Sequence, residues 1–283
     1  MKKLIIIMVC WLPLVSMAQE IVELWPDKIP NSRHTLKTDT LKENPTIAVF
    51  LPSKRIANGL GVVICPGGSY SWLAYEHEGT DLAKFFNGRG VAAFVLKYRL
   101  PNAKNDIEQH KSPLLDAKRA MEIVRAGAEK WNLDPSKIGI VGSSAGGHLA
   151  STLGTHFESE NRPDFMILLY PVVTMKGDYT HFGSRKNLLG ENPSDEMVTQ
   201  YSNELQVKEN TPPTFIVHCA DDRTVPVENS LQLVSALRKK KVPVELHVYP
   251  KGGHGFGLAL NKPRLKNWSN LMIEWLEDLS RIK

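Results

Sequence analysis

The stretch that decides the fold of this chain is Ile138-Gly139-Ile140-Val141-Gly142-Ser143-Ser144-Ala145-Gly146-Gly147. An apolar run leads into Gly142–Gly146, which fits the pattern G-x-S-x-G, and a helix-compatible segment follows. A buried strand, a sharp turn and a helix in this order form a nucleophile elbow, which exposes one serine hydroxyl at the top of a sheet. Small residues flank the serine because larger side chains would collide with the neighbouring strand and helix. Ser144 is therefore the candidate nucleophile.

Outward from this elbow, short apolar runs alternate with segments of helical periodicity. Most runs are apolar on both faces, as expected of parallel strands that helices cover. The runs are 61–65, 91–97, 138–141, 165–170, 214–219 and 244–249, with an antiparallel edge strand expected at 47–51. Helices are expected near 112–128, 227–239 and 265–279. The alternation predicts an α/β fold with a doubly wound, mostly parallel sheet flanked by helices.

One long segment does not follow this alternation. Residues 172–213 are polar and only weakly periodic, and they separate two of the expected strands. We interpret them as a small cap-like insertion over the strand ends rather than as a separate domain. Residues 19–283 are accordingly expected to form a single domain.

A serine needs a base and an acid that orients the base, and both follow Ser144 in the order Ser, Asp, His. Asp222 comes after the strand at 214–219, and His254 comes after the strand at 244–249 with glycine on both sides. The carboxyl ends of parallel strands are where open α/β sheets place their sites. Asp221 is the alternative acid, although its position nearer the strand end suits a turn. His218 lies within an expected buried strand and is interpreted as a core histidine.

The loop after the strand at 61–65 has the composition of an oxyanion hole. Pro66-Gly67-Gly68-Ser69-Tyr70 resembles the HGGG-type loop, whose backbone N–H groups face a developing oxyanion. Gly67 or Gly68 is expected to supply one N–H, and Ala145 the other. Tyr70 and Trp72 are candidates for substrate binding, because sugar rings stack on aromatic side chains, and Ser69 in the same loop is a further candidate. Core packing explains the aromatic residues about as well.

The first residues have the pattern of an export signal. Two lysines precede an apolar segment and Ser16-Met17-Ala18, so 1–18 is predicted to be a signal peptide that is removed from a bacterial periplasmic or extracellular protein. The formal net charge is only +5, and the single basic cluster, 238–241, suits a helix C-terminus better than a nucleic acid. Cys65 and Cys219 are expected to be buried free thiols, and no spacing indicates a metal site. No cofactor and no stable membrane insertion of the remaining chain are expected.

Together, four segments resemble the α/β-hydrolase carbohydrate esterases, and within them the bacterial acetylxylan esterase-like group. They are Cys65–Tyr70, 94–100, 142–148 and 252–256. The resemblance implies a serine esterase that removes short acyl groups, foremost acetyl, from a plant polysaccharide such as xylan or from its oligosaccharides. Two positions depart from the family pattern. Ser69 stands where the third glycine of the loop is usual, and Cys219 where a glycine usually follows the strand histidine.

Three other functions stay open at this point. A feruloyl or other carboxylic-ester hydrolase would share the elbow and the fold, with a different acyl pocket. An exopeptidase of this fold usually carries a large additional domain, for which 19–283 leaves little room. A non-catalytic glycan-binding protein would be expected to lack part of the Ser, Asp and His set, which is complete here. The oligomeric state is not indicated by any pattern.

Overall fold

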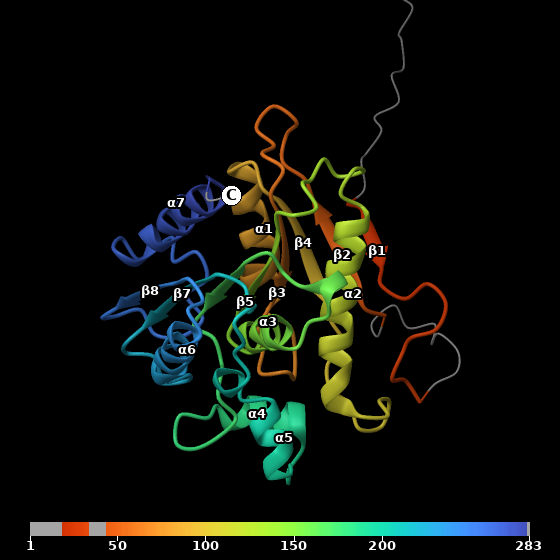
Figure 1. Cartoon of the computed structure of the whole chain (residues 1–283), viewed down its shortest axis with the longest axis vertical. Helices are drawn as coiled ribbons and strands as arrows, with labels where there is room; N and C mark the ends of the chain where they lie inside the picture. The colour runs from red at the N-terminus through yellow and green to blue at the C-terminus, as the bar shows by residue number, and fades with distance from the viewer. Residues whose placement is uncertain (1–18, 34–43, 282–283) are drawn as a thin grey trace, which may run out of the picture.

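The computed structural model describes residues 19–33 and 44–281, and in this part of the chain eight strands form one sheet (Figure 1). In sheet order the strands are β1 (Ile21–Glu23), β2 (Thr46–Phe50), β4 (Ala92–Lys97), β3 (Gly61–Cys65), β5 (Ile138–Ser143), β6 (Met166–Leu169), β7 (Thr214–Cys219) and β8 (Val244–Tyr249). Strands β3 to β8 are mutually parallel, whereas β2 is antiparallel to both of its neighbours. The predicted doubly wound, mostly parallel sheet is therefore confirmed.

Helices cover both faces of the sheet, because successive residues of its central strands are apolar on alternate sides. Val63 and Cys65 of β3 pack in the cluster that contains α2, α3 and α6, whereas Val62 and Ile64 pack in the cluster that contains α1 and α7. The helices are α1 (Asp81–Gly88), α2 (Ser112–Ala126), α3 (Ala145–Thr155), α4 (Phe182–Leu189), α5 (Asp195–Gln200), α6 (Glu228–Lys239) and α7 (Trp268–Arg281). A π-helical turn, η1 (Glu76–Thr80), precedes α1, and 3₁₀ turns lie at η2 (Gln109–Lys111), η3 (Ser159–Asn161), η4 (Asn203–Leu205) and η5 (Leu265–Asn267).

The antiparallel side of the sheet differs from the prediction. The strand expected at 47–51 forms as β2, but it is not at the edge, because β1 pairs along its outer side. The sequence did not indicate β1, since it has three residues and its side chains are half-buried or exposed. The short helices α1, α4 and α5 were also not predicted.

The segment 172–213 leaves the sheet at the end of β6 and returns at the start of β7. It carries α4 and α5, which lie together beyond the carboxyl ends of the parallel strands (Figure 1). The amide of Asn187 in α4 donates a hydrogen bond of 2.8 Å to the carbonyl oxygen of Ser69. The insertion is therefore bonded directly to the glycine loop after β3.

The cysteine prediction is confirmed. Cys65 and Cys219 are both free and buried, and the strands that carry them are separated by β5 and β6. The predicted signal peptide, 1–18, lies outside the described residues. No helix within 19–33 and 44–281 combines the length and the apolar character needed to span a membrane.

A buried ion pair fixes the N-terminal segment against the sheet. The guanidinium group of Arg99 lies 2.7 Å from the carboxylate of Asp116, whose side chain is fully buried. The indole N–H of Trp25 donates to the same carboxylate, and Arg99 also donates to the carbonyl oxygen of Pro30. The pair thus connects the residues before β2 with the end of β4 and with α2.

Replacing Arg99 by methionine should lower the free energy of unfolding by about 3–5 kcal/mol, because a buried charge loses its partner. Denaturant unfolding would measure the change. The matched control is Lys186→Met, which removes the partner of Glu191 in a pair whose side chains are both more than half exposed. That change should lower the free energy of unfolding by at most about 1 kcal/mol. Equal effects of the two substitutions would contradict the structural role of the Arg99 pair.

Candidate active site

Ser144 occupies a sharp turn between β5 and α3. Its backbone has φ 52° and ψ −120°, a conformation that L-residues rarely adopt and that stores strain. The turn is possible because α3 packs very close to β3. A Cβ atom on Gly146 would lie 2.0 Å from the carbonyl oxygen of Cys65, so only glycine fits there. The strand, turn and helix order expected of a nucleophile elbow is present.

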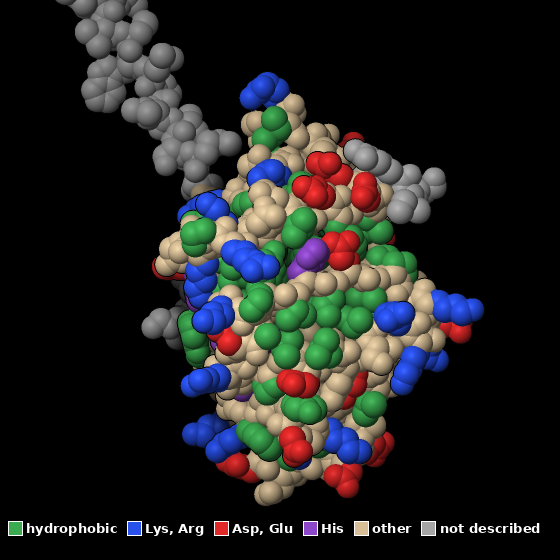
Figure 2. All heavy atoms as spheres, turned by 90° about the vertical axis from the view of Figure 1, so that its left-hand side faces the viewer, with side chains coloured by type: hydrophobic (Ala, Val, Ile, Leu, Met, Phe, Trp, Pro, Cys, Tyr) green, Lys and Arg blue, Asp and Glu red, His purple; other side chains and the backbone are tan. Residues whose placement is uncertain are grey.

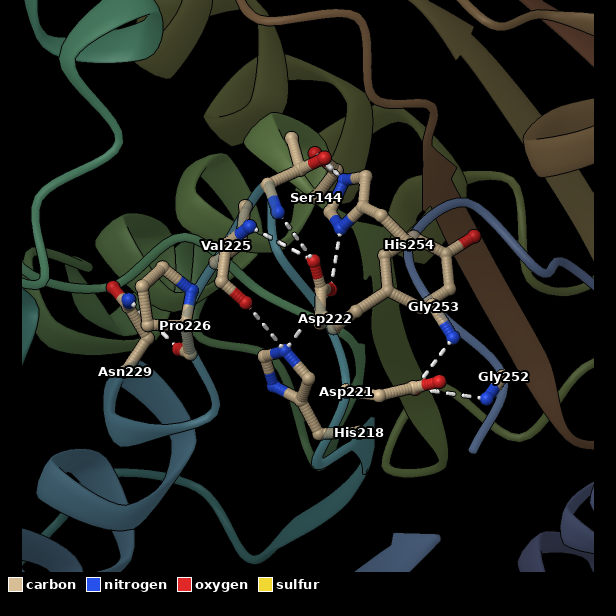
Figure 3. A network of polar contacts seen from close by, with 12 residues as sticks. Ser144, His218, Asp221, Asp222, Val225, Pro226, Asn229, Gly252, Gly253 and His254 are labelled. Carbon is tan, nitrogen blue, oxygen red and sulfur yellow. Dashed lines mark hydrogen bonds and ion pairs between the residues drawn. The ribbon is translucent and has the colours of Figure 1, made fainter. Parts of the chain in front are cut away.

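The three side chains singled out in the sequence lie in one hydrogen-bonded row (Figure 3). The hydroxyl oxygen of Ser144 is 2.8 Å from Nε2 of His254, and Nδ1 of His254 is 2.6 Å from Oδ2 of Asp222. Ser144 is 6% exposed and the side chain of Asp222 is buried, whereas His254 remains partly open to solvent. The imidazole is therefore the member of the row most open to solvent, while the acid is shielded.

The carboxylate of Asp222 has a full set of donors. Oδ1 accepts the backbone N–H groups of Thr224 and Val225, each at 2.9 Å. Nε2 of His218 donates to the carbonyl oxygen of Val225 and also lies 3.3 Å from Oδ2. Burial alone would raise the pKa of Asp222, but the hydrogen bonds from His218 and His254 outweigh it and hold this pKa well below its usual range. The acid is thus a stable anion beside the imidazole.

His218 is buried, as expected of a core histidine, and its Nδ1 accepts a hydrogen bond from the hydroxyl of Ser230. The sequence did not indicate its contact with Asp222. The spacing of four residues between the two was a possible signal, but the contact depends on the turn that follows β7.

Asp221, the alternative acid, has a different place. Its Oδ1 accepts the backbone N–H groups of Gly252 and Gly253, at 2.9 and 2.8 Å (Figure 3). These glycines immediately precede His254. Asp221 therefore holds the loop that carries the histidine, and the structure places Asp222, not Asp221, against the imidazole.

The glycine loop after β3 requires one correction. Gly67 was a candidate oxyanion donor, but its N–H donates to Oε2 of Glu78 at 2.8 Å. Gly68 has φ 125°, and a Cβ atom there would lie 2.1 Å from the carbonyl oxygen of Trp72, so this position also requires glycine. No hydrogen bond within the described part of the chain engages the N–H of Gly68. Ala145 is the first residue of α3, where an N–H has no partner within the helix. Of the three candidates, Gly68 and Ala145 are therefore the two whose N–H groups are available to an oxyanion.

Glu78 was missed by the sequence analysis, and it connects two loops of the site. It is 3% exposed, and its Oε1 accepts the hydroxyl of Tyr170 at 2.8 Å. The hydroxyl oxygen of Tyr170 in turn accepts the N–H of Gly257, and its ring packs edge-on against the ring of His254 with 4.9 Å between centroids. Glu78 thus links the glycine loop after β3, which we call the oxyanion loop, to the loop that carries His254. A possible signal in the sequence was that Glu78 lies four residues before Leu82, which places both on the same buried face of a helical segment.

The three candidates for substrate binding have different surroundings. Tyr70 is only 2% exposed and its hydroxyl donates to Nδ1 of His148, so its ring is a core side chain and the prediction of substrate binding is corrected. Trp72 is 56% exposed and its indole lies against Gly68. Ser69 has φ 55° and its carbonyl oxygen accepts the amide of Asn187. Trp72 is the candidate placed to meet a ligand.

His148, on the first turn of α3, is fully buried and joins two segments. Its Nδ1 accepts from Tyr70, and its Nε2 donates to the carbonyl oxygen of Tyr201 in the insertion, at 2.8 Å. Burial lowers the pKa of His148 to about 4, although the bond to Tyr201 opposes this. The imidazole is therefore neutral near pH 7.

His148 should make the protein less stable in acid. Its pKa is lower in the folded chain than the ordinary 6.5, so the unfolded chain binds the proton first as the pH falls. The loss of stability should begin near pH 6.5 and be complete below pH 4. The free energy of unfolding should fall by about 3 kcal/mol over this range. Unfolding free energies of the wild type and of His148→Gln across this range would measure it. The variant should lack this loss. The comparison variant His77→Gln should retain it, because the contact with Glu78 raises the pKa of His77, which therefore acts in the opposite direction. The same acid loss in all three proteins would contradict the assignment.

The arrangement combines a hydroxyl, an imidazole, a carboxylate and two free backbone donors. These groups suit nucleophilic attack on a carbonyl carbon through a covalent acyl intermediate. Among residues 19–33 and 44–281, no group of three or more His, Cys, Asp or Glu side chains is placed to hold a metal ion.

Two family models match the chain. The model of the prolyl oligopeptidase family matches residues 115–281, which include all three side chains of the row, and the BD-FAE model matches residues 47–182. Among curated proteins, the chain is 41% identical over 236 residues to endo-1,4-beta-xylanase B of Butyrivibrio fibrisolvens, covering 80% of the chain and 36% of that protein. It is 38% identical over 234 residues to an acetylxylan esterase of Xylanibacter ruminicola, covering 81% and 46%. The chain spans less than half the length of these curated relatives.

Solved structures match over nearly their whole length. An acetyl ester-xyloside bifunctional hydrolase from Caldicellulosiruptor lactoaceticus is 39% identical, with a TM-score of 0.84 over 94% of this chain and 98% of that one. A sugar hydrolase from Lactococcus lactis is 28% identical, with a TM-score of 0.73 over 89% and 99%. The chain therefore belongs to the α/β-hydrolase carbohydrate esterases of the acetylxylan esterase-like group, and its residues 115–281 match the prolyl oligopeptidase family model.

Proposed function

We propose that this protein is an exported serine esterase that removes short acyl groups, foremost acetyl, from xylan-type polysaccharides or their oligosaccharides. The observation that carries the proposal is the continuous row from Ser144 through His254 to Asp222, with contacts of 2.8 and 2.6 Å. A hydroxyl, an imidazole and a buried anion at these distances are what an activated serine nucleophile requires.

In the first half of the reaction, the hydroxyl oxygen of Ser144 attacks the ester carbonyl carbon while Nε2 of His254 takes the hydroxyl proton. Asp222 holds the proton on Nδ1 and stabilises the imidazolium that forms. The N–H groups of Gly68 and Ala145 donate to the oxyanion of the tetrahedral intermediate. The intermediate then breaks its bond to the sugar oxygen, which receives the proton from Nε2, and the acyl group stays on Ser144.

In the second half, water attacks the acyl-enzyme. Nε2 of His254 takes a proton from the water, and the same two N–H groups stabilise the second oxyanion. Collapse of this intermediate releases the carboxylic acid and returns the proton to Ser144. The row of side chains therefore supplies the proton transfers of both halves.

Acetylated xylan is the substrate we propose, because the relatives that match over most of this chain include proteins named for acetylxylan and for acetyl ester-xyloside hydrolysis. The exposed indole of Trp72, next to the oxyanion loop, is a surface on which a sugar ring could stack. A feruloyl ester remains the alternative within the same chemistry. Export follows from the sequence pattern of 1–18 alone and stays a prediction.

A peptidase is the second candidate, because the match to the prolyl oligopeptidase family model covers the whole row of catalytic candidates. The two functions share the acyl-enzyme chemistry and differ in the leaving group, which is an alcohol in one and an amine in the other. Substrate comparison therefore separates them, whereas loss of the serine does not.

Replacing Ser144 by alanine should lower kcat for p-nitrophenyl acetate by roughly 10⁶-fold, because the attacking oxygen is lost. Release of p-nitrophenolate would measure it, with circular dichroism as a check that the variant is folded. Asp222→Asn should impair turnover far more than Asp221→Asn, which loosens only the histidine loop. Turnover retained by the folded Ser144→Ala variant would refute the serine mechanism, and a larger effect of Asp221→Asn would assign the acid to Asp221.

The wild-type protein should release acetate from acetylated xylan faster than ferulate from feruloylated arabinoxylan, and it should not cleave dipeptide p-nitroanilides. Quantification of the released acids and of p-nitroaniline on the same preparation would measure the three rates. Faster ferulate release would contradict the acyl group proposed, and peptide cleavage as the dominant activity would contradict the esterase.

Replacing Glu78 by glutamine should lower kcat about 5- to 100-fold with little change in KM, since one of two buried donors, Gly67 N–H or the Tyr170 hydroxyl, loses its acceptor. The oxyanion acts in the transition state, so an oxyanion loop that is held less firmly changes kcat rather than binding. The matched control is Glu76→Gln, an exposed glutamate on the same turn, which should leave both constants unchanged. Equal activity of the two variants would contradict the role of Glu78 in positioning the loop.

A further inference from the structure

The two edges of the sheet are different. At one edge, β1 has only three residues, and very short edge strands are a common way of avoiding pairing with another chain. At the other edge, β8 has six residues, which pair with β7 in unbroken register. Charged side chains, proline and β-bulges are the usual protections of an edge. Strand β8 contains no proline, lysine or β-bulge, and Glu245 is its one acidic residue. Its side chains are half-buried or exposed, whereas β3 and β5 to β7 are fully buried.

The backbone of β8 presents regularly spaced groups at this edge. The carbonyl oxygens of Pro243 and Tyr249 accept N–H groups from the β7 side, from Thr214 and Ala220. Because peptide groups alternate in direction along a strand, those of the odd-numbered residues face β7, and those of Val244, Leu246 and Val248 face outward. Outside the sheet, no hydrogen bond among the described residues involves the N–H or C=O groups of these three residues.

The side chains of β8 alternate in character as well. The outward-bonding residues, 244, 246 and 248, are all apolar, and Val248 is 44% exposed. Leu231 of α6, the helix that packs on β8, is 46% exposed. Figure 2 views this side of the molecule, and hydrophobic side chains gather across the middle of the face. The intervening residues are Glu245 and His247, and within one strand Nε2 of His247 lies 2.6 Å from Oε1 of Glu245.

The residues from 244 to 248 are Val-Glu-Leu-His-Val. Read in reverse, this order keeps valine at both ends and leucine in the middle, and it exchanges the glutamate with the histidine. If a second strand of this sequence runs antiparallel with Leu246 opposite Leu246, each Val244 lies opposite a Val248, and each Glu245 lies opposite a His247. The outward peptide groups of 244, 246 and 248 then meet those of the other strand in hydrogen-bonded pairs. The alternative registers centred on residue 245 or 247 place two glutamates or two histidines opposite each other.

We propose that β8 is the interface of a symmetric dimer, in which a second copy of this chain pairs antiparallel with β8 in the register centred on Leu246. The two sheets then form one continuous sheet across a two-fold axis. The α6 helices of the two copies lie antiparallel on the same side of it. This orientation directs the acidic first turn of each α6, with Glu228, toward the basic last turn of the other, with Arg238 and Lys239. The palindromic charge order favours a second copy of this chain over an unrelated peptide.

Sedimentation velocity of the full chain at micromolar concentration should show a dimer. Glu245→Lys removes the acid from both Glu–His pairs across the interface and places a lysine opposite each His247, so it should raise the dimer dissociation constant about tenfold or more. The double variant Glu245→Lys with His247→Glu restores opposite charges across the interface and should restore the dimer. Glu274→Lys, the same charge change at an exposed position of α7, should have no effect.

Cysteine pairing tests the register. Residues 245 and 247 of two copies form a non-hydrogen-bonded pair in the proposed register, with Cα atoms about 4.5 Å apart, which a disulfide can span. A mixture of Glu245→Cys and His247→Cys chains should therefore form a linked dimer under mild oxidation, and either variant alone should form far less. Non-reducing electrophoresis would compare the three samples with the parent chain.

A monomeric parent chain would overturn the proposal, as would a dimer that Glu245→Lys leaves unchanged. Linkage of each cysteine variant with itself, at the level of the mixture, would overturn the register. Loss of the dimer in the single variant and its return in the double variant support the interface. The mixed-cysteine linkage then separates pairing between two copies from the Glu245–His247 contact within one strand.

Discussion

The backbone of Ser144, held at φ 52°, is the constraint on which the rest of the site depends. A residue in this conformation projects its hydroxyl out of the line of β5, and the turn persists because the surrounding packing fixes it. The close approach of Gly146 to the carbonyl oxygen of Cys65 shows how tightly α3 is held against β3. The strand order then brings the loops after β3, β7 and β8 to the same end of the sheet, around this hydroxyl.

A second feature is shared by the loops that surround Ser144: in each, a carboxylate accepts the backbone N–H groups. Glu78 holds Gly67 in the oxyanion loop, and Asp221 holds Gly252 and Gly253 before the histidine. Asp222 holds the turn after β7 while it also contacts His254. Charged acceptors form stronger hydrogen bonds than neutral ones, so loops without regular secondary structure can still present fixed geometry. Glu78 and Asp221 therefore position the residues of the site without belonging to the row of Ser144, His254 and Asp222.

The sequence allowed the sheet, the elbow, Asp222 and His254 to be predicted because each has a local pattern: an apolar run, a glycine turn and a polar side chain just after a strand. It could not show that Gly67 is bonded to Glu78, eleven residues away, or that the ring of Tyr70 turns inward to His148, since these contacts exist only after the chain has folded. Strand β1 was missed for a similar reason. Three half-exposed or exposed residues carry no periodic signal, and their pairing is set by β2.

The most direct measurement of the central claim is the location of a covalent label. The protein would be treated with a fluorophosphonate, digested, and analysed by peptide mass spectrometry, in parallel with a His254→Ala variant. If Ser144 is the nucleophile that His254 activates, a single adduct should appear on the peptide that contains Ser144, and it should form far more slowly in the variant. An adduct on another residue, or labelling of Ser144 at an equal rate without His254, would contradict that mechanism.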